Sequence, residues 1–283
     1  MLQSDYSATA RRPVSRNTFT LATSTESRSV ASTARDSAGR VRPFLGMMER
    51  DPYVFDIRWM AYLLATASIE TGWLFKPVDE KGHGKLGKVK KGPDKGKWKI
   101  KDYYLPVKVK LLKDGTASVT EQDGDEFVVR ADGSAYDPVG SGHRGAKAID
   151  AKTNAFTQPT AVYTREGGVE RSYYGRGFCQ LTWWDNYASA GWVLGRNLDF
   201  LFDPDLVLEP EIAYEIMAVG MRTGTIFANG MKISRFICGN HCDYLHARQM
   251  VNGMSEARKI ADIAVEFEGA LLASKGALYA AAL

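Results

Sequence analysis

Cysteine is scarce in this chain, with three cysteines among 283 residues. An odd and low count argues against a disulfide framework, which small secreted domains use in place of a large core. The segment CGNHC places Cys238, His241 and Cys242 close together. A structural zinc site normally takes four ligands, and no second Cys/His pair stands out in the sequence. We therefore expect reduced thiols, no metal and no cofactor.

Long apolar runs are also lacking. The longest run, Trp59 to Ile69, is about half as long as a membrane-spanning helix needs to be. The N-terminal segment carries no apolar stretch of the secretory type. We therefore expect a protein made in the cytoplasm without a secretory signal. The net charge of +4 suits an anionic polymer or surface as a partner without requiring one.

Composition divides the chain into three parts. Residues 1–37 are rich in Ser, Thr, Ala and Arg without periodicity, which predicts a flexible basic tail. Residues 38–83 and 161–283 repeat apolar residues at helical spacing and predict one helical domain. Residues 84–160 alternate like strands, with Asp-Gly turn signals, and predict a lysine-rich β insertion. The lysines fit a solvated face or attraction to an acidic polymer equally well.

One predicted helix ends in a carboxylate. The segment FDIRWMAYLLATASIETGW offers Asp56 as an N-cap, apolar residues on one face and Gly72 as a stop. Glu70 then falls in the last turn. The negative end of the helix dipole and apolar neighbours would both favour the protonated carboxylic acid that a general acid needs. A capping or salt-bridged surface glutamate would occupy the same position.

Two further carboxylates, Asp79 and Glu80, follow shortly after this helix. Pro77 forces an extended path before them. A turn and a return could place one of them across a cleft from Glu70. Paired carboxylates across a sugar-sized groove are typical of glycosidic bond hydrolysis. A solvated turn would explain the same residues.

The segment YYGRGFCQLTWWDNY, residues 173–187, combines aromatic rings with amides and hydroxyls. Aromatic rings stack on the apolar faces of sugars, and amides pair with the sugar hydroxyls. Rings come from Tyr173, Tyr174, Trp183, Trp184 and Tyr187, and polar groups from Gln180, Thr182 and Asn186. The alternative is a tight turn into a helix with core aromatics, and we expect Tyr187 and one tryptophan to be in the core.

These motifs resemble those of a known enzyme family. GRGFCQLTWWDNY resembles the Gly-Arg-Gly-x-x-Gln-Leu-Thr/Ser-x-x-x-Asn-Tyr segment of the family 19 glycoside hydrolases, which comprise plant-type chitinases and lysozyme-like endolysins. AYLLATASIETGW resembles the segment around the family's general acid, and PVDEKGHGKLG a stretch of its bacterial and phage members. DYLHARQMVNG and ARKIADIAVEFEGAL resemble its C-terminal motif and closing helix. The resemblance covers residues 55–83 and 170–272. It implies a mainly α fold, a lysozyme-like helical domain with a central β-rich insertion.

The resemblance also implies residue roles. Glu70 matches the general acid, Glu80 the general base that activates water, and Thr182 a hydroxyl residue that helps to hold that water. The expected substrate-binding residues are Gln180, Asn186, Asn252, Trp183, Tyr174 and Arg176, the last in a structural or bracing role. The family acts with inversion, so the two carboxyl groups are expected about 6.5–9.5 Å apart. Asp79, Glu166 and Glu170 are alternatives for the second carboxylate.

The motifs do not separate chitin from peptidoglycan, because both are β-1,4-linked polymers that contain N-acetylglucosamine. The scarce cysteines and PVDEKGHGK favour a lysozyme- or muramidase-type hydrolase of the bacterial cell wall. We expect a monomer that acts on peptidoglycan strands, binds no nucleic acid, and reaches the cell wall or periplasm after release or delivery. An endolysin fits, as does an antibacterial effector with a secretion machinery and an immunity or inhibitor protein. The alternatives are a chitinase and, from another class, a non-catalytic glycan-binding module.

Overall fold

The computed structural model describes most of the chain beyond its N-terminal segment. The described residues are 39–80, 86–88, 98–100, 106–121, 124–130, 133, 135–136, 168–227 and 230–281. About half of them are helical, and the described strand pairs are antiparallel, so the fold is mixed α and β. The prediction of a mainly α fold therefore holds only loosely. The predicted tail and much of the lysine-rich segment lie outside the described residues.

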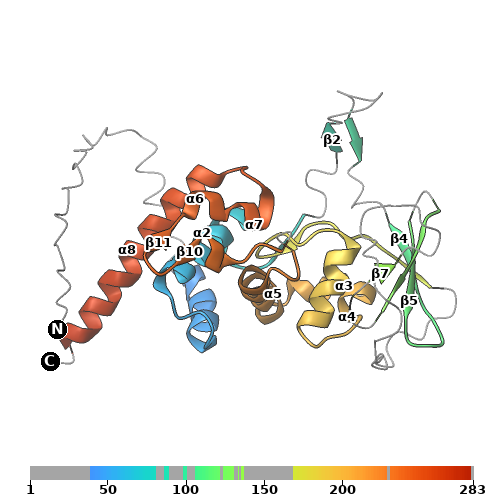
Figure 1. Ribbon diagram of the computed structural model, residues 1–283, viewed down its shortest axis with the longest axis horizontal. Helices are drawn as coiled ribbons and strands as arrows, with labels where there is room; N and C mark the ends of the chain where they lie inside the picture. The colour runs from blue at the N-terminus through green and yellow to red at the C-terminus, as the bar shows by residue number, and fades with distance from the viewer. Residues whose placement is uncertain are drawn as a thin grey trace, which may run out of the picture.

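The larger sheet lies at one end of the molecule with α3 and α4 beside it, and α8 lies toward the other end (Figure 1). The described helices are a helix over residues 39–50, α2 (Ile57–Glu70), α3 (Trp184–Val193), α4 (Asp199–Phe202), α5 (Pro210–Thr223), α6 (Tyr244–Ala247), α7 (Gln249–Asn252) and α8 (Ala257–Ala281), with 3-10 helices at Pro204–Leu208 and Ile233–Arg235. None of them has the length and apolar character of a membrane span.

The larger sheet has five strands in the order β7-β6-β5-β4-β8. Its strands are β4 (Val107–Leu111), β5 (Ala117–Thr120), β6 (Glu126–Val129), β7 (Ala135–Tyr136) and β8 (Val169–Arg171). Along β4 buried valines alternate with exposed lysines, the period of a strand with one face in a core. β8 lies beyond residue 160, so the sheet also takes a strand from outside the predicted insertion.

Glycines close the hairpins of this sheet, as the Asp-Gly signals predict. Gly115, Gly124 and Gly133 have φ of 85°, 94° and 70°. Such positive φ values carry no steric penalty for glycine. At the first turn the Asp114 carboxylate accepts hydrogen bonds from the backbone and hydroxyl of Thr116 at 3.0 and 2.6 Å. The predicted strand–turn pattern is thus confirmed over the described part of the insertion.

Short two-stranded ladders complete the described strands. They are β1 (Val78–Asp79) with β9 (Arg176–Gly177), β2 (Leu86–Lys88) with β3 (Trp98–Ile100), and β10 (Ile237–Cys238) with β11 (His241–Cys242). The β1–β9 ladder joins the segment after α2 to the aromatic segment, although a long stretch of sequence separates them.

The predicted helix with Asp56 as its cap is confirmed as α2. The Asp56 carboxylate accepts a hydrogen bond from the backbone N–H of Arg58. It also forms an ion pair with the Arg58 guanidinium at 2.6 Å. Another guanidinium nitrogen of Arg58 donates to the carbonyl of Gly239 at 2.8 Å, which ties the start of α2 to the β10–β11 hairpin. The middle of α2 is buried, and the helix packs against α8.

We expect Asp56→Ala to lower the free energy of unfolding by about 1 kcal/mol, the typical value of an N-cap. The hydrogen bond to Arg58 lowers the pKa of Asp56 below the usual value of an aspartate. A carboxylate whose pKa is lowered by folding stabilises the folded protein above the pKa of the unfolded state. This contribution is lost as the pH falls through the lower pKa of the folded state. Urea unfolding at pH 7 and pH 3 measures it. Asp56→Asn, which keeps a capping oxygen, is the control, and an alanine effect that does not shrink at low pH would contradict the assignment.

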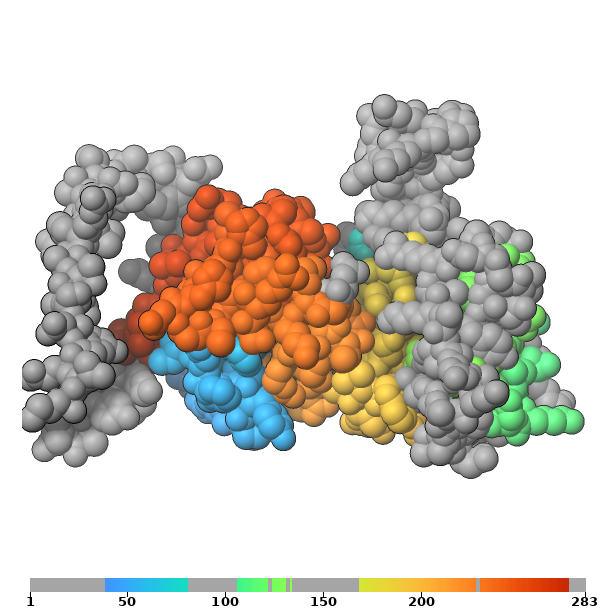
Figure 2. Space-filling model, in the orientation of Figure 1, coloured from blue at the N-terminus to red at the C-terminus, as the bar shows by residue number. Residues whose placement is uncertain are grey.

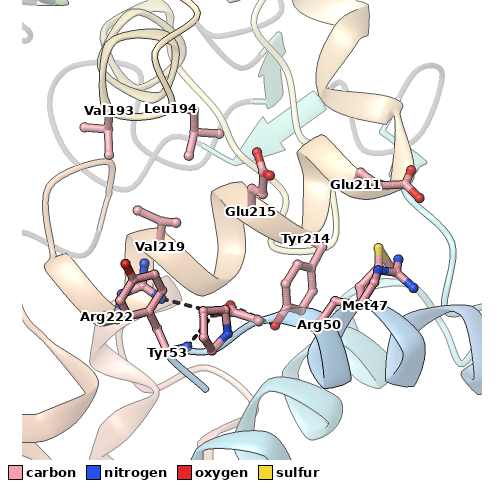
Figure 3. Close-up of a pocket in the computed structure, with 12 residues that line it drawn as sticks. Met47, Arg50, Tyr53, Val193, Leu194, Glu211, Tyr214, Glu215, Val219 and Arg222 are labelled. Atoms are coloured by element: carbon pink, nitrogen blue, oxygen red, sulfur yellow. Dashed lines mark hydrogen bonds and ion pairs between the residues drawn. The ribbon is translucent and has the colours of Figure 1, made fainter. Parts of the chain in front are cut away.

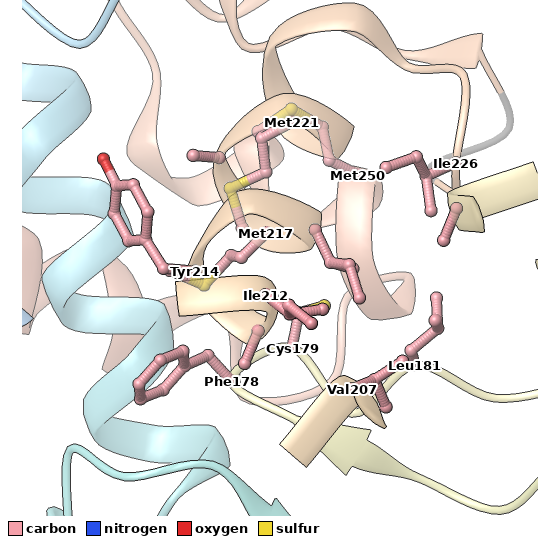
Figure 4. Close-up of a cluster of buried hydrophobic side chains, with 14 of the residues drawn as sticks. Phe178, Cys179, Leu181, Val207, Ile212, Tyr214, Met217, Met221, Ile226 and Met250 are labelled. Atoms are coloured by element: carbon pink, nitrogen blue, oxygen red, sulfur yellow. The ribbon is translucent and has the colours of Figure 1, made fainter. Parts of the chain in front are cut away.

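The main core lies between α2, α5, α7 and the segment that follows β9 (Figure 4). It contains Met217 and Met221 of α5, Met250 of α7, and Phe178 with Cys179 of that segment, each no more than 5% exposed. Burial raises the pKa of the Cys179 thiol to about 12, with the charge of Glu70 as a second cause. This cysteine is thus a neutral core side chain.

The sheet joins the helical body through α3. The indole N–H of Trp184 donates to the Glu121 carboxylate at 2.7 Å, and the Trp184 ring lies 5.2 Å from the Phe127 ring. Tyr187 and Trp184 are 0% and 3% exposed, which confirms that Tyr187 and one tryptophan belong to the core. In the space-filling view the blue, orange and yellow segments form one continuous body (Figure 2).

Candidate active site

Glu70 is the last residue of α2, as the sequence predicts, and the chain turns sharply after it. Gly72, Trp73 and Phe75 have φ of 58°, 64° and 48°. For non-glycine residues such values are uncommon and costly, and they persist where the surroundings fix them. Here the Trp73 N–H donates to the Ser68 carbonyl at 2.6 Å. The Phe75 N–H donates to the Thr71 hydroxyl at 3.1 Å. The turn therefore holds the end of α2, and Glu70 with it, in one position.

A buried arginine faces Glu70. Arg248, which precedes α7, is 2% exposed, and its Nη1 lies 2.6 Å from Oε1 of Glu70. The guanidinium also donates through Nε to the Ser255 carbonyl at 2.9 Å. The sequence did not identify Arg248 as the partner, although a salt-bridged glutamate was the alternative to a carboxylate among apolar neighbours. Glu70 and Arg248 thus form an ion pair that is largely shielded from solvent.

Glu80 lies beside the aromatic segment because β1 pairs with β9. The Glu80 N–H donates to the Gly175 carbonyl at 2.8 Å, and the Gly175 N–H donates back to Oε2 of Glu80 at 3.3 Å. Gln180, in a positive-φ conformation of 54°, donates through its amide to the carbonyl of Val78 at 3.1 Å. These contacts bring Glu80 and Gln180 to the same glycine.

Gly175 marks how closely these side chains approach. A Cβ atom at this position would lie 2.7 Å from Oε1 of Gln180 and 3.1 Å from Oε2 of Glu80. Glu70, for its part, is close enough to act electrostatically on Cys179, the residue before Gln180. Of the two predicted carboxylates, Glu80 therefore contacts this segment directly at Gly175, and Glu70 acts on it through its charge at Cys179.

Arg176 occupies a bracing position. It is 3% exposed, and its guanidinium carbon lies 3.7 Å from the centre of the Tyr174 ring. It donates to the Tyr187 hydroxyl at 3.1 Å and to the Asp205 carboxylate at 2.9 Å. Tyr174 is 7% exposed. Burial of this pair favours the structural role for Arg176 and places the Tyr174 ring in the packing beneath the segment.

The other predicted substrate-binding residues are more accessible. Trp183 and Asn186 are half-buried at the start of α3, and the Asn186 amide donates to the Thr182 carbonyl at 2.8 Å. Thr182 is also half-buried. Asn252 is exposed at the end of α7, and its N–H donates to the carbonyl of Arg248, the residue that pairs with Glu70.

The alternatives for the second carboxylate are placed differently. Asp79 lies opposite Arg176 in the β1–β9 ladder. Glu170 lies opposite Lys108 in the five-stranded sheet and is exposed. Glu166 is outside the described residues.

Cys238 and His241 of the CGNHC segment face each other across the β10–β11 hairpin. No three metal-ligating side chains come together within the described part of the chain.

Comparison with known proteins points to chitinases over a short segment. Two endochitinases of Arabidopsis thaliana are each 41% identical to this chain over 61 residues, which make up 21% of this chain and 20% of the endochitinase. The chain thus matches about a fifth of the length of these curated relatives. No family model matches. Over this short segment the chain is chitinase-like.

Proposed function

We propose that this protein hydrolyses β-1,4 glycosidic bonds in a polymer of N-acetylated amino sugars, with Glu70 as general acid and Glu80 as general base. The observation that carries the proposal is that Glu80 lies against Gly175 of the aromatic segment, while Glu70, held at the end of α2 by the turn after it, acts through its charge on Cys179 of the same segment. The short similarity to endochitinases supports the same class of reaction.

The proposed reaction is a single displacement. Glu70 gives its proton to the glycosidic oxygen as the bond to the anomeric carbon breaks. Water attacks that carbon from the opposite face and loses a proton to Glu80, so the anomeric configuration inverts. The Glu70 carboxylate left after this step is the ion-pair partner of Arg248, whose Nη1 lies 2.6 Å from its Oε1. Thr182 is assigned to hold the water, and Gln180, Asn186, Trp183 and Asn252 to contact the sugar.

We propose bacterial peptidoglycan as the polymer, with action at the cell wall after release or delivery. Chitin is the second candidate, and the endochitinase similarity is the observation that favours it. A measurement of soluble fragments released from purified peptidoglycan and from colloidal chitin, side by side, separates the two. Glu70→Gln on both polymers is the control for contaminating activity.

Release from peptidoglycan by the wild type alone is the expected result. Release from chitin alone would move the assignment to a chitinase. Equal release by wild type and Glu70→Gln would remove Glu70 from its role. Retention on either polymer without any release would favour a non-catalytic glycan-binding module.

Gly175→Ala is expected to lower turnover by about a hundredfold, the effect of an ångström-scale displacement in an active site. Gly175 has no positive φ, so alanine fits its backbone. The added methyl would displace the Gln180 amide and the Glu80 carboxylate instead. Initial rates on a soluble oligosaccharide and the melting temperature are the measurements.

The matched control for this variant is Gly269→Ala. Gly269 lies in α8, and a Cβ there meets nothing within 4 Å. It should leave turnover unchanged and stabilise the helix by about 0.5–1 kcal/mol. Full activity of Gly175→Ala would mean that Glu80 and Gln180 do not belong to the active site.

A further inference from the structure

A pocket away from the proposed catalytic residues lies between the helix over residues 39–50 and α5 (Figure 3). Its volume is about 430 Å³, within the range of about 300–1,000 Å³ that is usual for small-molecule sites. Residues 50–53 form one wall, and the exposed face of α5 forms the other. None of the proposed catalytic residues Glu70, Glu80 and Thr182 lines this pocket.

Tyr53 forms a fixed aromatic platform in this pocket. Its side chain is 60% exposed, yet the Arg222 guanidinium lies 4.4 Å from the ring centre. Asp51 holds both residues, since it accepts a hydrogen bond from the Tyr53 N–H at 2.9 Å and pairs with Arg222 at 3.7 Å. The Tyr214 hydroxyl donates to the other Asp51 oxygen at 3.1 Å. A ring held on one face loses little freedom when a ligand covers the other.

A second exposed ring follows directly. Phe55 is 79% exposed, whereas Val54 between the two rings is 5% exposed, so both aromatic side chains lie on the solvent side of this segment. The Phe55 ring lies 6.1 Å from the Trp59 ring, and the Trp59 indole N–H donates to the Ile237 carbonyl at 2.9 Å. We call Tyr53 and Phe55 the aromatic strip.

Polar groups of both signs surround the pocket beside the strip. Glu211 and Glu215 are one helical turn apart on α5, and both are exposed and line the pocket, as does Arg50. Carboxylates and guanidinium groups pair with hydroxyl and amide groups in fixed planar geometries. The two glutamates would be repelled by an anionic lipid surface. Exposed rings beside mixed planar polar groups favour a neutral, hydroxyl-rich ligand.

We propose that the aromatic strip and this pocket form a second, non-catalytic glycan-binding surface. It takes β-1,4-linked N-acetylhexosamine units, whose apolar ring faces cover Tyr53 and Phe55 while their hydroxyls reach the glutamates of α5. The choice of this glycan rests on the proposed function. The surface holds the enzyme on an insoluble polymer while bonds are cut elsewhere.

The test compares wild type with the double variant Tyr53→Ala/Phe55→Ala in sedimentation with chitin beads and with peptidoglycan sacculi. We expect about tenfold weaker retention on the polymer that the enzyme cuts, equivalent to about 1.4 kcal/mol. The rate on a short soluble oligosaccharide should not change. Tyr53→Phe/Phe55→Tyr keeps both rings and should retain binding. Val265→Ala/Leu272→Ala, which removes two exposed apolar side chains of α8, is the control for non-specific adsorption.

Equal retention of wild type and the double alanine variant would overturn the proposal of a second glycan-binding surface, whatever the rate of hydrolysis. An equal loss in the α8 control would also overturn it, because adsorption would then be non-specific. Preferential binding to phosphatidylcholine vesicles, with no retention on either polymer, would assign the strip to a membrane and overturn it. Ring-dependent retention without hydrolysis of any polymer would support the surface and overturn the proposed catalysis, so the two failures are distinguishable.

Discussion

Arg248→Met is expected to lower the free energy of unfolding by about 3–5 kcal/mol, because removal of one partner leaves the other charge buried and unpaired. Arg248 is 2% exposed, and Glu70, at 2.6 Å, has 15% of its side chain exposed. Methionine has a similar length and fills much of the same space, so the variant tests charge more than volume. The hydrogen bond to Ser255 is lost as well.

Urea unfolding at neutral pH measures this effect, and a double-mutant cycle with Glu70→Gln separates its causes. If the unpaired carboxylate causes most of the loss, the double variant recovers much of the stability. Arg258→Met is the control, because Arg258 is exposed at the start of α8, and it should change stability by less than about 0.5 kcal/mol. An equal loss in single and double variants would mean that Arg248 acts through Ser255 and packing, independently of Glu70.

Local structure was largely predictable from the sequence. Asp56 and Gly72 mark the ends of α2, and the helix is buried on all sides over residues 61–68, beyond the single apolar face that the spacing predicts. α5 follows the same logic, with its end at Gly224, which has a φ of 68°. The glycines of the Asp-Gly pairs close the hairpins of the sheet. In each case the signal lies within a few residues, where backbone and capping preferences act directly.

Contacts between distant segments were not predictable in the same way. Nothing near Glu70 in the sequence points to Arg248, and the pairing depends on how the chain between α6 and α7 reaches the end of α2. The choice of Trp184 over Trp183 for the core depends on Phe127 and Glu121 in the sheet. Periodicity says which residues are buried, whereas the identity of each partner depends on tertiary packing. The motif that contains Arg248 was recognised, but its arginine carried no local signal of a partner.

Glu70→Gln and Glu80→Gln are each expected to reduce turnover of a natural oligosaccharide by roughly a hundredfold to ten-thousandfold, the usual contribution of general acid–base catalysis. The two variants should differ on a substrate with a good leaving group, such as a dinitrophenyl glycoside. Departure of that group needs no proton, so Glu70→Gln should recover much of its rate. Glu80→Gln still lacks the group that activates water and should remain slow.

This contrast tests the roles and not merely the importance of the two residues. Glu70→Gln removes the charge that pairs with Arg248 and could destabilise the protein. The melting temperature of each variant must therefore be measured beside its rate. Glu170→Gln is the matched control, because this exposed glutamate lies in the sheet opposite Lys108. Recovery by Glu80→Gln with the activated substrate, and none by Glu70→Gln, would exchange the two roles. Glu70, paired with Arg248, would then be the base, and the carboxyl group beside Gly175 would supply the proton.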